Sequence, residues 1–225
     1  MVEKNTKTTF YLVRHAEAAG NINRVFQGSM NAELSENGHK QLTLLAERCK
    51  NFPVDVIYTS PLIRARKTAE AFNTYHNAPV IIDPRLVEID GGEFEGKPWE
   101  QLVHAFPEQF AVWTGNHGCF EAPGGETVKA VQERMTAAFT DIAFQEKGKS
   151  IAIISHGCAL RTLICFLKGL TLDEIKQVSW KENTAITKFT FENGRAVFEF
   201  ENDSTHLGDY QSPLSGQSWW KKVEK

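Results

Sequence analysis

Short apolar runs alternate along the chain with longer segments in which apolar residues recur at helical spacing. The apolar runs lie at residues 9–14, 54–58, 80–82 and 150–155. Their length and composition are typical of β-strands, and the first and last are predicted to be buried. The clearest helical segment begins near Glu126 and has its apolar face at Val128, Val131, Met135, Ala138, Phe139 and Ile142. This alternation predicts helices packed on a mostly parallel sheet.

Residues typical of element ends support these boundaries. Ser35 is predicted to cap the helix that follows it, because a serine side chain can accept a bond from the first helical turn. Ser60 and Pro61 predict another helix start, with serine as the cap and proline in the first helical position. Near the C-terminus, two alternating segments flank Asn193-Gly194, which favours a two-residue hairpin turn.

Two segments interrupt the alternation. Residues 17–33 are polar and rich in Asn, which predicts a loop. Residues 91–124 combine glycine and proline with large aromatic side chains, including Trp99 and Trp113. This composition predicts a helical insertion or lid made of short pieces, which should form a wall that selects the substrate.

The predicted fold class is therefore α/β. We expect a three-layer sandwich over a mostly parallel sheet, with an antiparallel edge strand and a small helical insertion near 91–124. One domain is predicted to span residues 1–225, with a C-terminal tail at about 207–225. Trp219 and Trp220 in this tail are expected to pack on the body or on a second subunit, so both a monomer and a homodimer remain open.

Composition and charge exclude several classes of protein. The 225 residues carry 25 Lys and Arg against 28 Asp and Glu, a net charge of −3, so no basic excess is present to bind a nucleic acid. The chain has no apolar run long enough to span a membrane and no apolar segment of a signal peptide in its first residues. Its four cysteines form no CxxC pair and are expected to be buried and reduced. We therefore expect a soluble cytoplasmic protein with no nucleic-acid or membrane partner.

Polar and charged residues follow three of the predicted strands: Arg14-His15 after the first, Ser60 and then Arg64 after the second, and His156 after the last. In open α/β sheets, ligands bind outside the carboxyl ends of the strands. Arginine binds phosphate oxygens with two parallel hydrogen bonds, and helix N-termini add backbone donors. The pattern predicts a site for a phosphoryl group.

Motifs that would bind a metal or a nucleotide do not occur in the sequence. There is no HExxH, no GxxxxGK[ST], and no PCxxC after His15-Ala-Glu17. We therefore expect neither a metal nor another cofactor. A neutral imidazole is the best candidate to attack phosphorus, because histidine is nucleophilic near neutral pH.

From about Phe10 to His206, the chain resembles the histidine phosphatase superfamily, also called phosphoglycerate-mutase-like (branch 1), and within it a phosphatase-type member. The resemblance depends on six segments in order: LVRHAE at 12–17, Gln27-Gly28, TSPLIRARKT at 59–68, LVEIDGGEFEG at 86–96, Pro123–Glu126 and Ser155–Gly157. Each segment is weak alone, but their order and spacing together are specific.

This resemblance implies a role for each site residue. His15 would form a phosphohistidine, and Arg14, Arg64 and His156 would surround the phosphoryl oxygens. Glu88 would protonate the leaving oxygen and then deprotonate the attacking water.

Several further residues have more than one possible role. Glu93 and Glu95 are rivals for the role of Glu88. Asn21, Gln27, Gly28 and Gly157 are candidates for binding the phosphate or the rest of the substrate. Glu17 is expected to orient the nucleophile loop or to be solvated, Glu126 is either a helix N-terminal charge or a site residue, and Arg66 is expected to be exposed.

Three functions compete for this site. The first is a metal-independent phosphatase that acts on a small phosphorylated metabolite, and the second is a cofactor-dependent phosphoglycerate mutase. Such mutases carry an ERHYG segment where this chain has Glu88-Ile-Asp-Gly-Gly-Glu-Phe-Glu95, which adds acidic groups and no cation. This difference favours hydrolysis. The third, a binding module without catalysis, would be expected to lack the nucleophile or the second histidine, and this chain has both.

Overall fold

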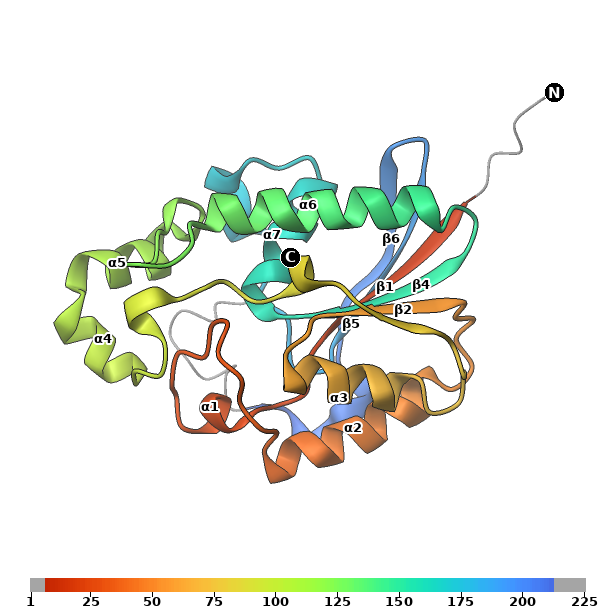
Figure 1. Cartoon of the computed structure of the whole chain (residues 1–225), viewed down its shortest axis with the longest axis horizontal. Helices are drawn as coiled ribbons and strands as arrows, with labels where there is room; N and C mark the ends of the chain where they lie inside the picture. Colours follow the sequence, from red (N-terminus) through yellow and green to blue (C-terminus); the bar gives the residue numbers. More distant parts are fainter. Residues whose placement is uncertain (1–6, 213–225) are drawn as a thin grey trace.

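The computed structural model describes residues 7–212 and contains one six-stranded sheet (Figure 1). Its strands are β1 (Thr8–Arg14), β2 (Val56–Thr59), β3 (Val80–Ile82), β4 (Ser150–Ser155), β5 (Ile186–Glu192) and β6 (Arg195–Asp203). They are arranged in the order β3-β2-β4-β1-β5-β6, with β1 and β4 at the centre.

The sheet is parallel in its first four positions and antiparallel at one edge. β4 pairs in parallel with both β1 and β2, β2 pairs in parallel with β3, and β5 is antiparallel to both β1 and β6. Asn193 and Gly194, with φ angles of 51° and 75°, form the predicted turn between β5 and β6. The expected fold class is confirmed.

Helices cover both faces of this sheet (Figure 1). α6 (Val128–Gln145) and α7 (Gly157–Leu167) lie on one face, and α2 (Glu36–Cys49) and α3 (Ile63–Phe72) lie on the other. The alternation of side chains along β1 separates two cores: Phe10 and Leu12 pack with α6 and α7, whereas Tyr11 and Val13 pack with α2 and α3. All six positions predicted as the apolar face of α6 are buried.

Residues 91–124 form the expected helical insertion beside one end of the sheet (Figure 1). It contains α4 (Trp99–Ala105), α5 (Pro107–Gly115) and two short 3₁₀ helices. Phe94, Trp113 and Phe120 are buried in the same core as α6 and α7. The insertion is therefore packed onto the body, where it can contribute a wall to the site.

Several local predictions were wrong. Ser60 does not cap a helix, because α3 begins at Ile63 after Leu62. The Ser60 hydroxyl oxygen accepts the backbone N–H of Leu62 at 3.3 Å, before the first helical residue, and also bonds to the ring of His156. The expected loop at 17–33 contains a short helix, α1 (Ala19–Ile22). The cysteines are free, but Cys119 is exposed whereas the other three are buried.

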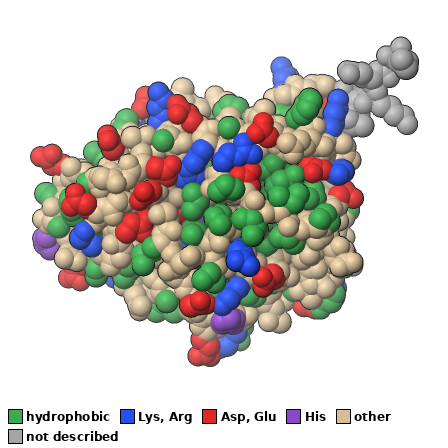
Figure 2. Space-filling model, viewed as in Figure 1, with side chains coloured by type: hydrophobic (Ala, Val, Ile, Leu, Met, Phe, Trp, Pro, Cys, Tyr) green, Lys and Arg blue, Asp and Glu red, His purple; other side chains and the backbone are tan. Residues whose placement is uncertain are grey.

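The described surface and termini give three further observations. Figure 2 shows acidic and basic side chains interspersed on one face of the molecule, so this face has no continuous basic area. None of the helices between residues 7 and 212 has the length and apolar character needed to cross a membrane. Trp219 and Trp220 lie outside the described residues, and the described start of the tail forms a 3₁₀ helix at Thr205–Tyr210.

Candidate active site

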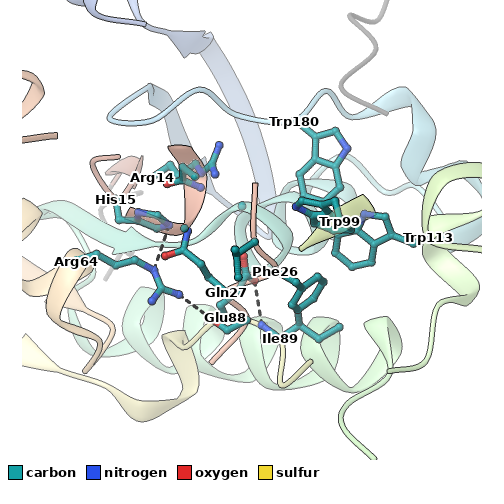
Figure 3. Close-up of a pocket in the computed structure, with 15 residues that line it drawn as sticks. Arg14, His15, Phe26, Gln27, Arg64, Glu88, Ile89, Trp99, Trp113 and Trp180 are labelled. Carbon is teal, nitrogen blue, oxygen red and sulfur yellow. Dashed lines mark hydrogen bonds between the residues drawn. The ribbon is translucent and has the colours of Figure 1, made fainter. Parts of the chain in front are cut away.

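His15 lies directly after β1, buried at the floor of a pocket (Figure 3). Its Nδ1 lies 2.7 Å from the carbonyl oxygen of Ala16. Because a carbonyl only accepts, this bond places the ring proton on Nδ1 and leaves the lone pair on Nε2. Nε2 accepts a bond from Nε of Arg64 at 3.3 Å. Burial, together with the charges of Arg64 and Arg14, lowers the pKa of His15 well below 6.5, so the nucleophilic neutral form is favoured.

His156 follows β4 and faces His15, as the sequence predicted. Arg14 pairs with Ser155 in the parallel register of β1 and β4, so the two histidines leave adjacent strand ends, and their ring centroids are 5.1 Å apart. Nε2 of His156 lies 2.7 Å from the Ser60 hydroxyl oxygen. Burial, and then the charge of Arg64, lower the pKa of His156 well below 6.5.

Two buried guanidinium groups lie beside these rings. Arg64 is only 1% exposed, because it donates to the carbonyl oxygens of Met30 and Gly28, each at 2.7 Å. Burial lowers the pKa of Arg64 to about 10, which still leaves it cationic at neutral pH. Arg14 donates to the carbonyl oxygen of Lys181 at 2.5 Å. The two arginines, with His15 beside them, form a cationic end of the pocket suited to a phosphoryl group. His156 is fully buried next to His15 and is not among the residues that line the pocket.

Of the three candidate carboxylates, only Glu88 lines the pocket. Its oxygens accept bonds from the backbone N–H groups of Ile89, Cys158 and Ala159, each at 3.0 Å, so the carboxylate is fixed at the start of α7. Glu93 is exposed. Glu95 instead accepts bonds from the loop at Ser29 and from Gly91.

The segment that carries Glu88 is fastened to α6 by Arg134. Its guanidinium donates to the carbonyl oxygens of Arg85, Val87 and Glu88 at 2.7–3.1 Å. Arg134 also forms an ion pair with Glu126 at 2.9 Å, and Glu126 accepts the backbone N–H of Asp90. Glu126 lies just before α6, is not among the residues that line the pocket, and contacts the segment that carries Glu88 through Arg134 and Asp90.

We expect Arg134→Ala to lower kcat by roughly 10- to 100-fold, because a small displacement of a catalytic group has an effect of this size. The loss should be larger for alkyl phosphates than for p-nitrophenyl phosphate, because the displaced group, Glu88, is the proposed proton donor. Steady-state kinetics on both esters measures this split. Lys129→Ala, an exposed change on the same helix, is the control, and an equal loss on both esters would contradict the positioning role.

The remaining predicted residues, Asn21, Gln27, Gly28 and Gly157, all line the pocket. Asn21 accepts the backbone N–H of Ala18 through Oδ1, which fixes its side chain at the start of α1. Gly28 has a φ of 41°, and a Cβ there would lie 2.0 Å from a carboxylate oxygen of Glu95, so the close approach requires glycine. Their contacts with phosphate stay predictions.

Glu17 and Arg66 complete the sequence assignments. Glu17 is buried and accepts bonds from Ser35 and Asn37, so it is not solvated and it ties the nucleophile loop to α2. Arg66 is exposed, as expected.

Sequence reasoning missed a buried segment that supports the nucleophile. Asn183 donates from Nδ2 to the carbonyl oxygen of His15 at 2.8 Å, and the N–H of Thr184 donates to the carbonyl oxygen of Arg14 at 3.1 Å. Trp180, a few residues earlier, lines the pocket. The antiparallel pairing of β5 with β1 explains these contacts, since residues just before β5 lie beside residues just after β1. No motif in the sequence marked this segment.

We expect both site histidines to be neutral at pH 6.5 in the free protein. A lowered histidine pKa keeps the neutral form populated to more acidic pH, so both rings should titrate below their ordinary value. Nitrogen-15 NMR of histidine-labelled protein measures the two midpoints, with His15→Ala and His156→Ala used for assignment. A midpoint at or above 6.5 for either ring would contradict this electrostatic arrangement.

The model of the histidine phosphatase superfamily (branch 1) matches residues 10–204. The chain belongs to this superfamily. Phosphoserine phosphatase 1 from Hydrogenobacter thermophilus is 32% identical over 199 residues, which cover 88% of this chain and 94% of the relative. A probable phosphoglycerate mutase, GpmB from Cronobacter sakazakii, is 34% identical over 163 residues, which cover 71% of this chain and 74% of the relative.

Solved structures of the superfamily have the same fold. Bacillus stearothermophilus YhfR aligns with a TM-score of 0.84 and 31% identity, covering 89% of this chain and 99% of that chain. A phosphoserine phosphatase from Entamoeba histolytica, solved with phosphoserine, aligns with a TM-score of 0.78 and 28% identity, covering 89% and 99%. By its family, the chain is an enzyme that hydrolyses phosphoric monoesters.

Proposed function

We propose that this enzyme hydrolyses a small phosphorylated metabolite through a phosphohistidine on His15, without a metal. The observation that supports this most strongly is the state of His15: its proton is held on Nδ1, its Nε2 accepts a bond from Arg64, and its ring lies 5.1 Å from that of His156. A metal would supply positive charge to the phosphoryl oxygens, and here the protein's own Arg14 and Arg64 supply it.

In the first step, Nε2 of His15 attacks phosphorus while the bond from phosphorus to the ester oxygen breaks. Arg14, Arg64 and His156 bind the phosphoryl oxygens and stabilise the charge of the transition state. Glu88, in its protonated form, gives its proton to the departing oxygen, which leaves as a neutral alcohol. The products of this step are phosphohistidine and the Glu88 carboxylate.

In the second step, the Glu88 carboxylate takes a proton from a water molecule whose oxygen attacks phosphorus. The phosphorus–nitrogen bond breaks, inorganic phosphate leaves, and neutral His15 and protonated Glu88 are restored. Asn21, Gln27, Gly28 and Gly157 are proposed to contact the transferred group or the alcohol, since all four line the pocket.

The alternative is a phosphoglycerate mutase, which would return the phosphoryl group to another hydroxyl. Such an enzyme must hold a carboxylate and a second phosphoryl group, which require further cations. Among the described residues that line the pocket, the only Lys or Arg side chains are Arg14 and Arg64, and both lie at its nucleophile end. This lining favours hydrolysis.

A panel of phosphorylated metabolites, incubated with the purified protein and excess chelator, tests the proposal. We expect release of inorganic phosphate that added Mg²⁺ or Zn²⁺ does not increase, and no interconversion of 2- and 3-phosphoglycerate. Activity that disappears in chelator and returns with a divalent ion would refute the metal-free mechanism. Isomerisation faster than phosphate release would instead establish the mutase.

A further inference from the structure

The pocket has two ends of different chemistry (Figure 3). At one end lie Arg14, His15 and Arg64, the groups proposed to hold the phosphoryl group. The other end is lined by four aromatic side chains, which we call the aromatic wall: Phe26, Trp99, Trp113 and Trp180. Figure 3 shows the three indoles of this wall grouped together, away from Arg64. Trp180 also lies near Arg14, since a Cβ on Gly157 would lie 3.6 Å from an atom of each side chain. The alcohol part of a bound ester would have to lie against the wall.

The aromatic wall is assembled from four separate parts of the chain, and its members support one another. Phe26 follows α1, Trp99 begins α4, Trp113 belongs to α5, and Trp180 precedes β5. Ring centroids of adjacent members are 5.2–5.7 Å apart: Phe26–Trp99, Phe26–Trp113, Trp99–Trp113 and Trp113–Trp180. Because the rings are packed before a ligand arrives, stacking on them requires little further ordering.

The charges around the wall disfavour an acidic alcohol. Glu88 is the only acidic residue of the described lining, and the two arginines of the lining lie beside His15. Arg161 lies 4.6 Å from the Trp180 ring, but it donates to the carbonyl oxygens of Val178 and Ile175 and lines a neighbouring pocket. A carboxylate on the alcohol would therefore meet the indoles and the Glu88 carboxylate, because Arg14, the cation of the lining that lies near Trp180, is proposed to bind the phosphoryl group.

We propose that the preferred substrate is the phosphate monoester of an alcohol bearing a flat, uncharged aromatic group, which stacks on the aromatic wall. This inference rests on the proposed phosphatase function of the same site. It distinguishes this chain from the Entamoeba histolytica phosphoserine phosphatase, whose structure contains phosphoserine, an ester that carries a carboxylate and an ammonium group.

The test compares phosphate esters of primary alcohols, so that the leaving groups have similar intrinsic reactivity. Differences in kcat/KM then report how the alcohol part is bound. We expect kcat/KM for 2-(1-naphthyl)ethyl phosphate to exceed the values for ethyl phosphate, phosphoserine and 3-phosphoglycerate by roughly 10- to 100-fold, the size expected for one stacked ring system. Trp180→Ala and, separately, Trp99→Ala should move the ratio of naphthylethyl to ethyl phosphate toward one. Phe144→Ala, an aromatic side chain 84% exposed on α6, should leave that ratio unchanged.

The outcomes separate the two proposals. Similar kcat/KM values for all four esters, or a preference for phosphoserine or 3-phosphoglycerate, would overturn the aromatic substrate and leave the phosphatase proposal intact. Hydrolysis of none of the esters would overturn the phosphatase proposal and the inference with it. The comparison on the unaltered protein decides the question even when a tryptophan variant fails to fold.

Discussion

We expect His15→Ala to lower kcat for phosphate release by roughly 10⁴- to 10⁶-fold, the range seen when a nucleophile is removed from an enzyme that uses covalent catalysis. The remaining cationic groups would still bind phosphate. The variant would lack the nucleophile, which is the Nε2 atom beside Arg64. Quenching the unaltered enzyme during turnover of a phosphorus-32 ester should yield an acid-labile, base-stable label, and the variant should yield none.

His104→Ala is the matched control, because His104 is an exposed histidine in the insertion. Its kcat and its labelling should equal those of the unaltered enzyme. A variant lacking His15 that still becomes labelled would assign the nucleophile to another residue, and His156 would be the first to examine. Substrate binding, measured by calorimetry with a slow ester, should survive in His15→Ala and so show that the site is still folded.

The two histidines could be placed from the sequence because one rule of sheet topology applies to both. His15 and His156 each follow an unmistakable apolar run, and adjacent parallel strands end at the same edge. The hairpin at Asn193-Gly194 was predictable for a similarly local reason, since its turn requires two positive φ angles.

Arg64 could not have been assigned from the helical pattern alone. An arginine in the first turn of a helix is usually solvated, and its neighbour Arg66 is indeed exposed. The loop that contains Gly28 and Met30 buries Arg64. The carbonyl oxygens of these two residues accept hydrogen bonds from its two terminal nitrogens. That contact joins residues more than one element apart, so the helical pattern did not indicate it. The position of Arg64 after a strand end and the family resemblance did.

The wrong helix start at Ser60 and the missed segment at 180–184 have a different cause, because tertiary contacts determine both and local sequence rules do not. Ser60-Pro61 has the residues of a helix start, yet α3 begins only at Ile63, and the Ser60 hydroxyl bonds to Leu62 N–H and to His156, which is 96 positions away. Residues 180–184 have no period and no turn motif, so nothing in the pattern marked Asn183 as a support of His15. Such polar, irregular and buried segments become visible only once the strand order is known.

We expect Glu88→Gln to lower kcat for an alkyl phosphate by roughly 10²- to 10⁴-fold, the usual contribution of a general acid or base. The glutamine keeps one oxygen to accept a backbone N–H of α7, but it can neither protonate the departing alkoxide nor take a proton from water. With p-nitrophenyl phosphate the first step needs no proton, so the second step should become limiting. Rapid quench should then show a burst of p-nitrophenolate and more phosphohistidine at steady state than in the unaltered enzyme.

Glu93→Gln, at the exposed rival position, should change neither the rate nor the amount of label. The comparison therefore tests the assignment of Glu88 and the two-step mechanism together. A Glu88→Gln variant that lost activity equally on both esters, with no burst and no accumulated label, would show that Glu88 only anchors the start of α7 through the N–H groups of Cys158 and Ala159. The proton donor would then have to be sought elsewhere in the pocket, because neither Glu93 nor Glu95 lines it.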